Sequence, residues 1–130
     1  MLTNQEIFTK CRNHLLAQNA KSLRAGPDQP ASGHSPSACA YRGVDGLKCA
    51  AGIFIPDEQY SPLLEGRGVR ATIFKYPGVF AEIDFAPSGS KSASQLLVTL
   101  QDCHDSWPVS AWRRELGVIA RDFDLVVEGA

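Results

Sequence analysis

The chain has 130 residues, of which 44% are hydrophobic and 21% are charged, and its formal net charge is −1. These values are typical of one globular domain, residues 1–130, that is large enough to bury a core without the help of disulfides or metal ions. A charge so close to zero disfavours nucleic acid and anionic membranes as partners. No apolar run approaches the roughly 20 residues of a membrane helix. The first residues also lack the basic and apolar regions of a secretory signal.

The four cysteines, Cys11, Cys39, Cys49 and Cys103, indicate the compartment. An even number permits disulfides, but the spacing is irregular, and Cys11 and Cys103 fall on helical apolar stripes. Buried, reduced thiols are typical of the cytoplasm, where disulfides are rare. We therefore expect a cytoplasmic protein.

Helical and irregular segments alternate in the first part of the chain. Thr3 and Glu6 match a capping box, and apolar residues at helical spacing predict a helix over 4–24, ended by Gly26-Pro27. Residues 26–38 contain three prolines and almost no apolar side chain, which predicts a mobile loop.

The segment 39–57 combines two cysteines with an arginine, a tyrosine and several glycines. Its Asp45-Gly46 pair favours a tight turn and therefore a short hairpin. Residues 50–55 are apolar and fit either a buried strand or one short helix. Residues 56–60 and 62–65 are typical of short helical turns.

Alternation of apolar side chains predicts a second hairpin over 69–85. A three-residue loop, 76–78, places both apolar sets on one face, and its last residue, Gly78, would adopt a left-handed conformation. Phe74 and Phe80 would then face each other on the opposite side of the sheet. Replacing Gly78 with Val should destabilise such a hairpin.

Two further helices are predicted in the C-terminal part. Apolar residues repeat at helical spacing from Leu96 to Trp107 and again from Trp112 to Phe123, with Ser110 as the expected N-cap. Two such helices joined around Pro108 indicate an antiparallel helical hairpin. The fold class predicted is therefore α+β, with three main helices packed on a small antiparallel sheet.

A cysteine nucleophile is one hypothesis for chemistry. Cys49, with His104 as base and Asp105 beside it, supplies the residue types that thiolate catalysis needs, and Cys39 is the spare nucleophile. Neighbours on a helix point about 100 degrees apart, so Asp105 is expected to orient His104 poorly. A histidine at this helical position is more often a half-buried core residue bonded to a backbone carbonyl.

A metal site and an anion site are two further hypotheses. Cys39, Cys49, Cys103 and His104 are zinc-type ligands, but their spacing lacks the close pairs of a structural site, so we predict neither a metal nor a cofactor. Tyr41, Arg42 and Lys48 lie around the glycine turn and are candidate binding residues. Against an anion site, Arg42 is equally suited to pairing with Asp45 or Asp57.

The segment from Cys39 to Gly52, with the pattern C-x-Y-R-G-x-D-G-L-K-C-A-x-G, followed by Ile55-Pro56-Asp57, resembles a family of small uncharacterised bacteriophage and prophage proteins. The later Leu100-Gln101-x-x-His104-Asp105 is similar to the C-terminal part of that family. The resemblance covers the first helix, the cysteine segment and the last two helices. It implies an origin in a phage or another mobile element and supplies no mechanism.

Two classes of function follow. The first is a small interaction or regulatory protein that binds a protein partner, with Phe74 and Phe80 as an exposed aromatic pair. If residues 26–38 fold over these two side chains, they form a second small core instead. The second is a cysteine-dependent hydrolase or transferase that uses Cys49 and His104. The sequence leaves the oligomeric state open.

Overall fold

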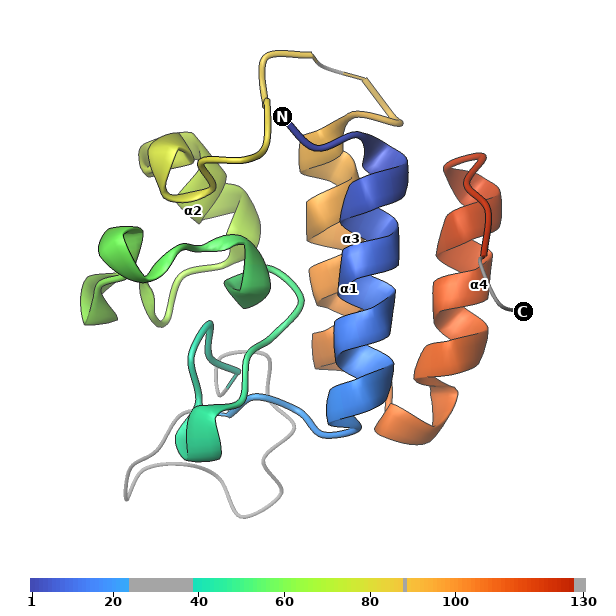
Figure 1. Cartoon of the computed structure of the whole chain (residues 1–130), viewed down its shortest axis with the longest axis horizontal. Helices are drawn as coiled ribbons and strands as arrows, with labels where there is room; N and C mark the ends of the chain where they lie inside the picture. The colour runs from blue at the N-terminus through green and yellow to red at the C-terminus, as the bar shows by residue number, and fades with distance from the viewer. Residues whose placement is uncertain (24–38, 88, 128–130) are drawn as a thin grey trace.

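Three helices pack side by side and form one half of the molecule (Figure 1). The computed structural model describes residues 1–23, 39–87 and 89–127. The three helices are α1 (Asn4–Gln18), α3 (Ala93–Ser106) and α4 (Trp112–Asp122). α3 and α4 run in opposite directions, which confirms the predicted helical hairpin. The predicted mobile loop at 26–38 lies outside the described residues.

The capping box that opens α1 is confirmed. The hydroxyl of Thr3 accepts the backbone N–H of Glu6 at 3.1 Å, and the Glu6 carboxylate accepts the backbone N–H of Thr3 at 2.8 Å. The predicted end of this helix at residue 24 is wrong. α1 ends at Gln18 because Asn19 adopts a left-handed conformation with φ of 52° and donates its N–H to Leu15.

The predicted α+β fold is wrong, because the described residues contain no sheet. Residues 69–75 form a helix, α2 (Val69–Lys75), and Pro77–Val79 form a 3₁₀ helix where the hairpin loop was expected. Val69 and Thr72 are buried and Ile73 is partly buried, and this i, i+3, i+4 spacing fits a helix. Apolar and polar side chains also alternate in this short segment, so its pattern fits both a strand and a helix. Packing against α3 favours the helix.

The turn after Cys39 is tight, as predicted, but its flanks do not extend into strands. Asp45 and Gly46 have φ of 59° and 74°, and the N–H of Leu47 donates to Val44 across them. Left-handed geometry at both central residues is the type I′ turn that Asp-Gly favours. Only one antiparallel bridge follows, between Arg42 and Lys48, so the predicted hairpin is reduced to its turn.

The rest of the chain between the turn and α2 consists of short 3₁₀ helices. Residues 50–55 fit a buried strand or a short helix in sequence, and the short helix is correct, since Gly52–Phe54 is a 3₁₀ helix. The helical turns predicted around residues 56–65 are confirmed at Asp57–Gln59 and Pro62–Leu64. The predicted N-cap, Ser110, lies inside the 3₁₀ helix Val109–Ala111. α4 follows this helix directly, beginning at Trp112, and its N-cap is Ala111.

The described residues outside the three-helix half that precede α3, 19–23 and 39–87, form what we call the irregular half. The core includes side chains packed between this half and the helices. Its largest fully buried side chains come from both halves, and they include Phe8, Phe54, Phe80, Leu100 and Trp112. Phe80 packs edge-to-face on Phe85, with ring centroids 5.7 Å apart. No helix among the described residues has the length and apolar character needed to cross a membrane.

Two glycines provide a matched test of this fold. A Cβ on Gly52 would lie 2.1 Å from the carbonyl oxygen of Tyr41, whereas a Cβ on Gly78 would meet nothing within 4 Å. Gly78 is also absent from the described glycines with positive φ, so the strain predicted for Gly78→Val does not arise.

We expect Gly52→Ala to lower the free energy of unfolding by about 3 kcal/mol, because backbone has to move. Gly78→Ala should change it by less than about 0.5 kcal/mol. Urea denaturation of both variants measures the difference. Equal destabilisation by the two substitutions would contradict the structure around Tyr41.

Candidate functional site

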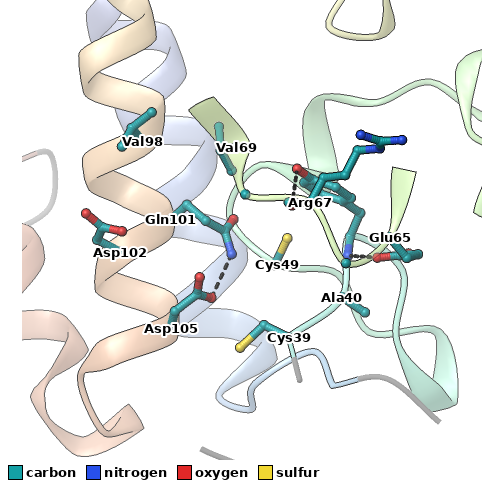
Figure 2. A pocket seen from close by; sticks show the side chains of 13 residues that line it. Cys39, Ala40, Cys49, Glu65, Arg67, Val69, Val98, Gln101, Asp102 and Asp105 are labelled. Atoms are coloured by element: carbon teal, nitrogen blue, oxygen red, sulfur yellow. Dashed lines mark hydrogen bonds between the residues drawn. The ribbon is translucent and has the colours of Figure 1, made fainter. Parts of the chain in front are cut away.

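A cavity of about 350 Å³ lies between α3 and the irregular half (Figure 2). Its walls come from residues 39–41, from Cys49, from residues 65–69 and from the α3 side chains Val98, Gln101, Asp102 and Asp105. The cavity therefore brings together segments far apart in sequence, and four of the predicted candidates line it: Cys39, Tyr41, Cys49 and Asp105.

Glu65 fixes the wall opposite α3. Its carboxylate accepts the backbone N–H groups of Tyr41 at 2.8 Å and Arg42 at 3.1 Å, and also the Tyr60 hydroxyl at 2.7 Å. These three hydrogen bonds hold the segment after Cys39 against the segment before α2.

The Tyr41 side chain joins the same wall to α2. Its hydroxyl lies 2.7 Å from the Thr72 hydroxyl and donates to the Arg67 carbonyl at 3.0 Å. Burial raises the pKa of Tyr41 to about 12, with the Thr72 hydrogen bond acting in the other direction. Tyr41 is thus a neutral, structural side chain at neutral pH.

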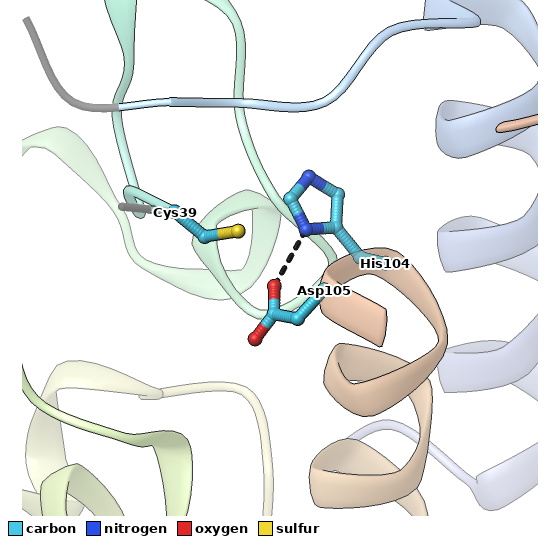
Figure 3. Close-up of side chains that lie close together, drawn as sticks. All are labelled: Cys39, His104 and Asp105. Atoms are coloured by element: carbon cyan, nitrogen blue, oxygen red, sulfur yellow. Dashed lines mark hydrogen bonds and ion pairs between the residues drawn. The ribbon is translucent and has the colours of Figure 1, made fainter. Parts of the chain in front are cut away.

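His104 is a fully buried histidine with both ring nitrogens in use. The backbone N–H of Ser22 donates to its Nε2 at 3.0 Å, so Nε2 carries no proton. Nδ1 therefore carries the proton of the neutral ring and donates to Oδ1 of Asp105 at 2.7 Å (Figure 3). The ring also stacks on Trp112, with centroids 5.4 Å apart.

The expectation that Asp105 orients His104 poorly is wrong. Although the two residues are neighbours on α3, their side chains bend toward each other. Gln101 donates its amide N–H to the same Oδ1 at 2.7 Å, and its oxygen accepts the Ala51 N–H at 2.9 Å. Gln101 and Ser22 were not predicted as site residues. The available signal for Gln101 is an amide beside the apolar stripe of α3, whereas no local pattern marks Ser22.

The cysteine close to His104 is Cys39, the spare candidate. The ligand atoms of Cys39, His104 and Asp105 lie within 4.8 Å of one another. Cys49 lines the cavity but is 1% exposed, and burial raises the pKa of its thiol more than the Gly52 and Ala51 N–H groups lower it. Burial likewise raises the pKa of Cys103 to about 12 and that of Cys11.

The arrangement does not suit His104 as a metal ligand or as a base for Cys39. Either role requires Nδ1 without its proton, which would move the proton of the neutral ring to Nε2, facing the N–H of Ser22. Two donors would then oppose each other in a buried place. Of the predicted zinc ligands, Cys49 and Cys103 are not in the three-residue group found among the described residues.

The remaining candidates lie outside this cluster. Arg42 pairs with Asp57 at 2.6 Å and stacks over Tyr60 at 4.4 Å, so Asp57 rather than Asp45 is its carboxylate partner. The backbone carbonyl of Lys48 accepts hydrogen bonds from α1 side chains. The predicted aromatic pair is separated, because Phe74 is 90% exposed on α2 whereas Phe80 is fully buried.

No family model, no curated protein and no solved structure matches the chain. The resemblance to a phage protein family therefore stays a prediction.

Thiol labelling tests the burial of the cysteines. We expect Cys39, which is partly exposed, to react with iodoacetamide at least about tenfold faster than Cys11, Cys49 or Cys103. Mass spectrometry of peptides after timed labelling measures the four rates. In denaturant all four rates should become similar. Native labelling of Cys49 as fast as that of Cys39 would contradict the buried position of Cys49.

Replacing His104 tests its structural role. His104→Ala leaves the Ser22 N–H unpaired and opens a cavity beside Trp112, so we expect a loss of about 3 kcal/mol in unfolding free energy. In the parent protein, nitrogen-15 NMR of the ring should show a protonated Nδ1 and a bare Nε2. The opposite tautomer would refute the assignment and restore His104 as a possible base.

Proposed function

We propose that this protein is a small cytoplasmic interaction protein, encoded by a phage or another mobile element, that binds a protein partner through α2. The observation that carries the proposal is Phe74, whose side chain is 90% exposed near the C-terminal end of α2. We use the name α2 surface for Phe74 and Lys75 of α2 together with Leu63 and Arg67 from the segment before it.

The α2 surface is rigid because the opposite side of the helix is anchored. Val69 is 5% exposed and Thr72 is fully buried, with its hydroxyl donating to the Tyr41 hydroxyl at 2.7 Å. α2 also packs against α3. An aromatic side chain held on a fixed element loses little entropy on binding, which favours its use as an anchor.

The charges close to Phe74 in the sequence indicate the chemistry of the partner. Residues 66–76 include Arg67, Arg70 and Lys75 and no acidic residue. Arg67 and Lys75 each lie 5.6 Å from the ring of Tyr76, and Arg67 also donates to the carbonyl of Leu63, which is itself 77% exposed. An acidic protein surface with an apolar pocket for Phe74 would complement this arrangement.

The second candidate function, a hydrolase or transferase using Cys49 and His104, has less support. Cys49 is buried with a raised thiol pKa, and both nitrogens of His104 are already in hydrogen bonds. The cytoplasmic location has indirect support, since the structure joins none of the four cysteines in a disulfide.

A pull-down from host-cell lysate, followed by affinity measurement with the purified partner, tests the proposal. Phe74→Ser and Lys75→Glu should each weaken binding at least about tenfold, because they remove the anchor and reverse a charge. Both substitutions are at exposed positions, so thermal stability should change little.

Val126→Ser is the matched control, because Val126 is 66% exposed at the other end of the chain. It should leave binding unchanged. A partner that binds Phe74→Ser as tightly as the parent would refute the role of α2. Capture that disappears on nuclease treatment would point to nucleic acid instead and would also overturn the proposal.

A further inference from the structure

We propose that the cavity beside α3 is a second, separate binding site that takes a small organic cation with an apolar body. Three observations carry this inference: the partners of the charged side chains that line the cavity, the hydrogen bonds that fix the Asp105 carboxylate, and the apolar side chains of the walls.

The charges that line the cavity are Glu65, Arg67, Asp102 and Asp105. Glu65 is saturated by two backbone N–H groups and the Tyr60 hydroxyl. The Arg67 guanidinium donates to Leu63 and lies over Tyr76, and Figure 2 shows it turned away from the α3 wall. Lys21 does not line the cavity, but its ammonium donates to the backbone carbonyl of Asp105 at 3.2 Å. Among the lining side chains, Asp102 and Asp105 are the charges left to give the cavity a negative character.

Asp105 is held in place before any ligand arrives. Two side chains that are nearly or fully buried, Gln101 and His104, donate to its Oδ1 at 2.7 Å each. Two such donors fix the direction of the carboxylate, and a fixed carboxylate costs little to organise for binding a cation.

Asp102 lies one turn before Asp105 on the same face of α3 and at the rim of the cavity. Burial and the charge of Asp105 raise the pKa of Asp102, and the charge of Arg70 acts in the other direction. A cation between the two carboxylates would relieve their repulsion.

The remaining walls favour an organic cation over a metal ion. Val69, Val98 and Tyr41 present apolar surface, and the cavity of about 350 Å³ is at the small end of ligand pockets. Hard divalent ions need several oxygen ligands, and one oxygen of Asp105 already accepts two hydrogen bonds. An amidinium or alkylammonium group on a small apolar body fits both features.

Three probes of nearly equal shape test the charge requirement: benzamidine, which is a cation at neutral pH, neutral benzamide and anionic benzoate. Ligand-observed NMR titration of the full chain should show benzamidine binding at least about tenfold more tightly than the other two. Equal binding of benzamidine and benzamide, or no binding of benzamidine by the folded protein, would overturn the proposal. So would stabilisation by calcium, magnesium or zinc chloride alone, without any effect of benzamidine.

Three variants locate the site. Asp102→Asn should weaken benzamidine binding about threefold to fivefold, as expected for an exposed charge pair. Val98→Phe should abolish binding by filling the cavity, while a retained circular dichroism spectrum and melting transition report that the fold is intact. Asp122→Asn, an exposed carboxylate on α4, is the matched control and should leave affinity unchanged. Binding unaffected by both cavity variants would refute this location.

The test does not depend on Phe74, although Arg67 belongs both to the α2 surface and to the cavity lining. Phe74→Ser should bind benzamidine like the parent protein, because Phe74 does not line the cavity. Failure of one proposal therefore leaves the other standing.

Discussion

The structure depends on a buried polar network centred on His104. His104 accepts the N–H of Ser22, Asp105 accepts from His104 and Gln101, and Gln101 accepts the N–H of Ala51. Two backbone groups of the irregular half are thereby bonded to α3. An unpaired buried donor costs about 1–3 kcal/mol, so each contact matters for how the two halves fit together.

The irregular half uses such contacts because the described residues have no sheet to pair their backbone groups. Its 3₁₀ helices, turns and isolated bridges pair some of these groups with other backbone groups. Polar side chains pair others: the Ser22 hydroxyl donates to the carbonyl of Ala40 at 2.7 Å, and the Glu65 carboxylate accepts the N–H groups of Tyr41 and Arg42. Backbone polar groups that are buried must be paired by some means, and here a few polar side chains complete the pairing.

The parts of the fold and of the site that were predictable are those set by local signals. The capping box fixes the start of α1, and the helical stripe from Leu96 fixes α3, since each signal needs no information from distant residues. Residues 69–75 satisfy both a two-residue and a helical period over a very short window, and only packing against α3 decides between a strand and a helix.

In the site, the residue types were visible in the sequence but their contacts were not, because Ser22 and His104 are 82 residues apart. The rule that helix neighbours diverge failed for Asp105, since it describes Cα–Cβ directions and not the ends of flexible side chains.

The hydrogen bonds of this network also give different roles to the neighbouring residues His104 and Asp105. Ser22 occupies Nε2 of His104, which leaves Nδ1 as a donor to Asp105 and removes the ring from acid–base work. The same hydrogen bond directs the Asp105 carboxylate at the cavity wall. A histidine that looks catalytic in sequence therefore acts as a positioning group, and the charge it supports faces a space that a ligand can enter.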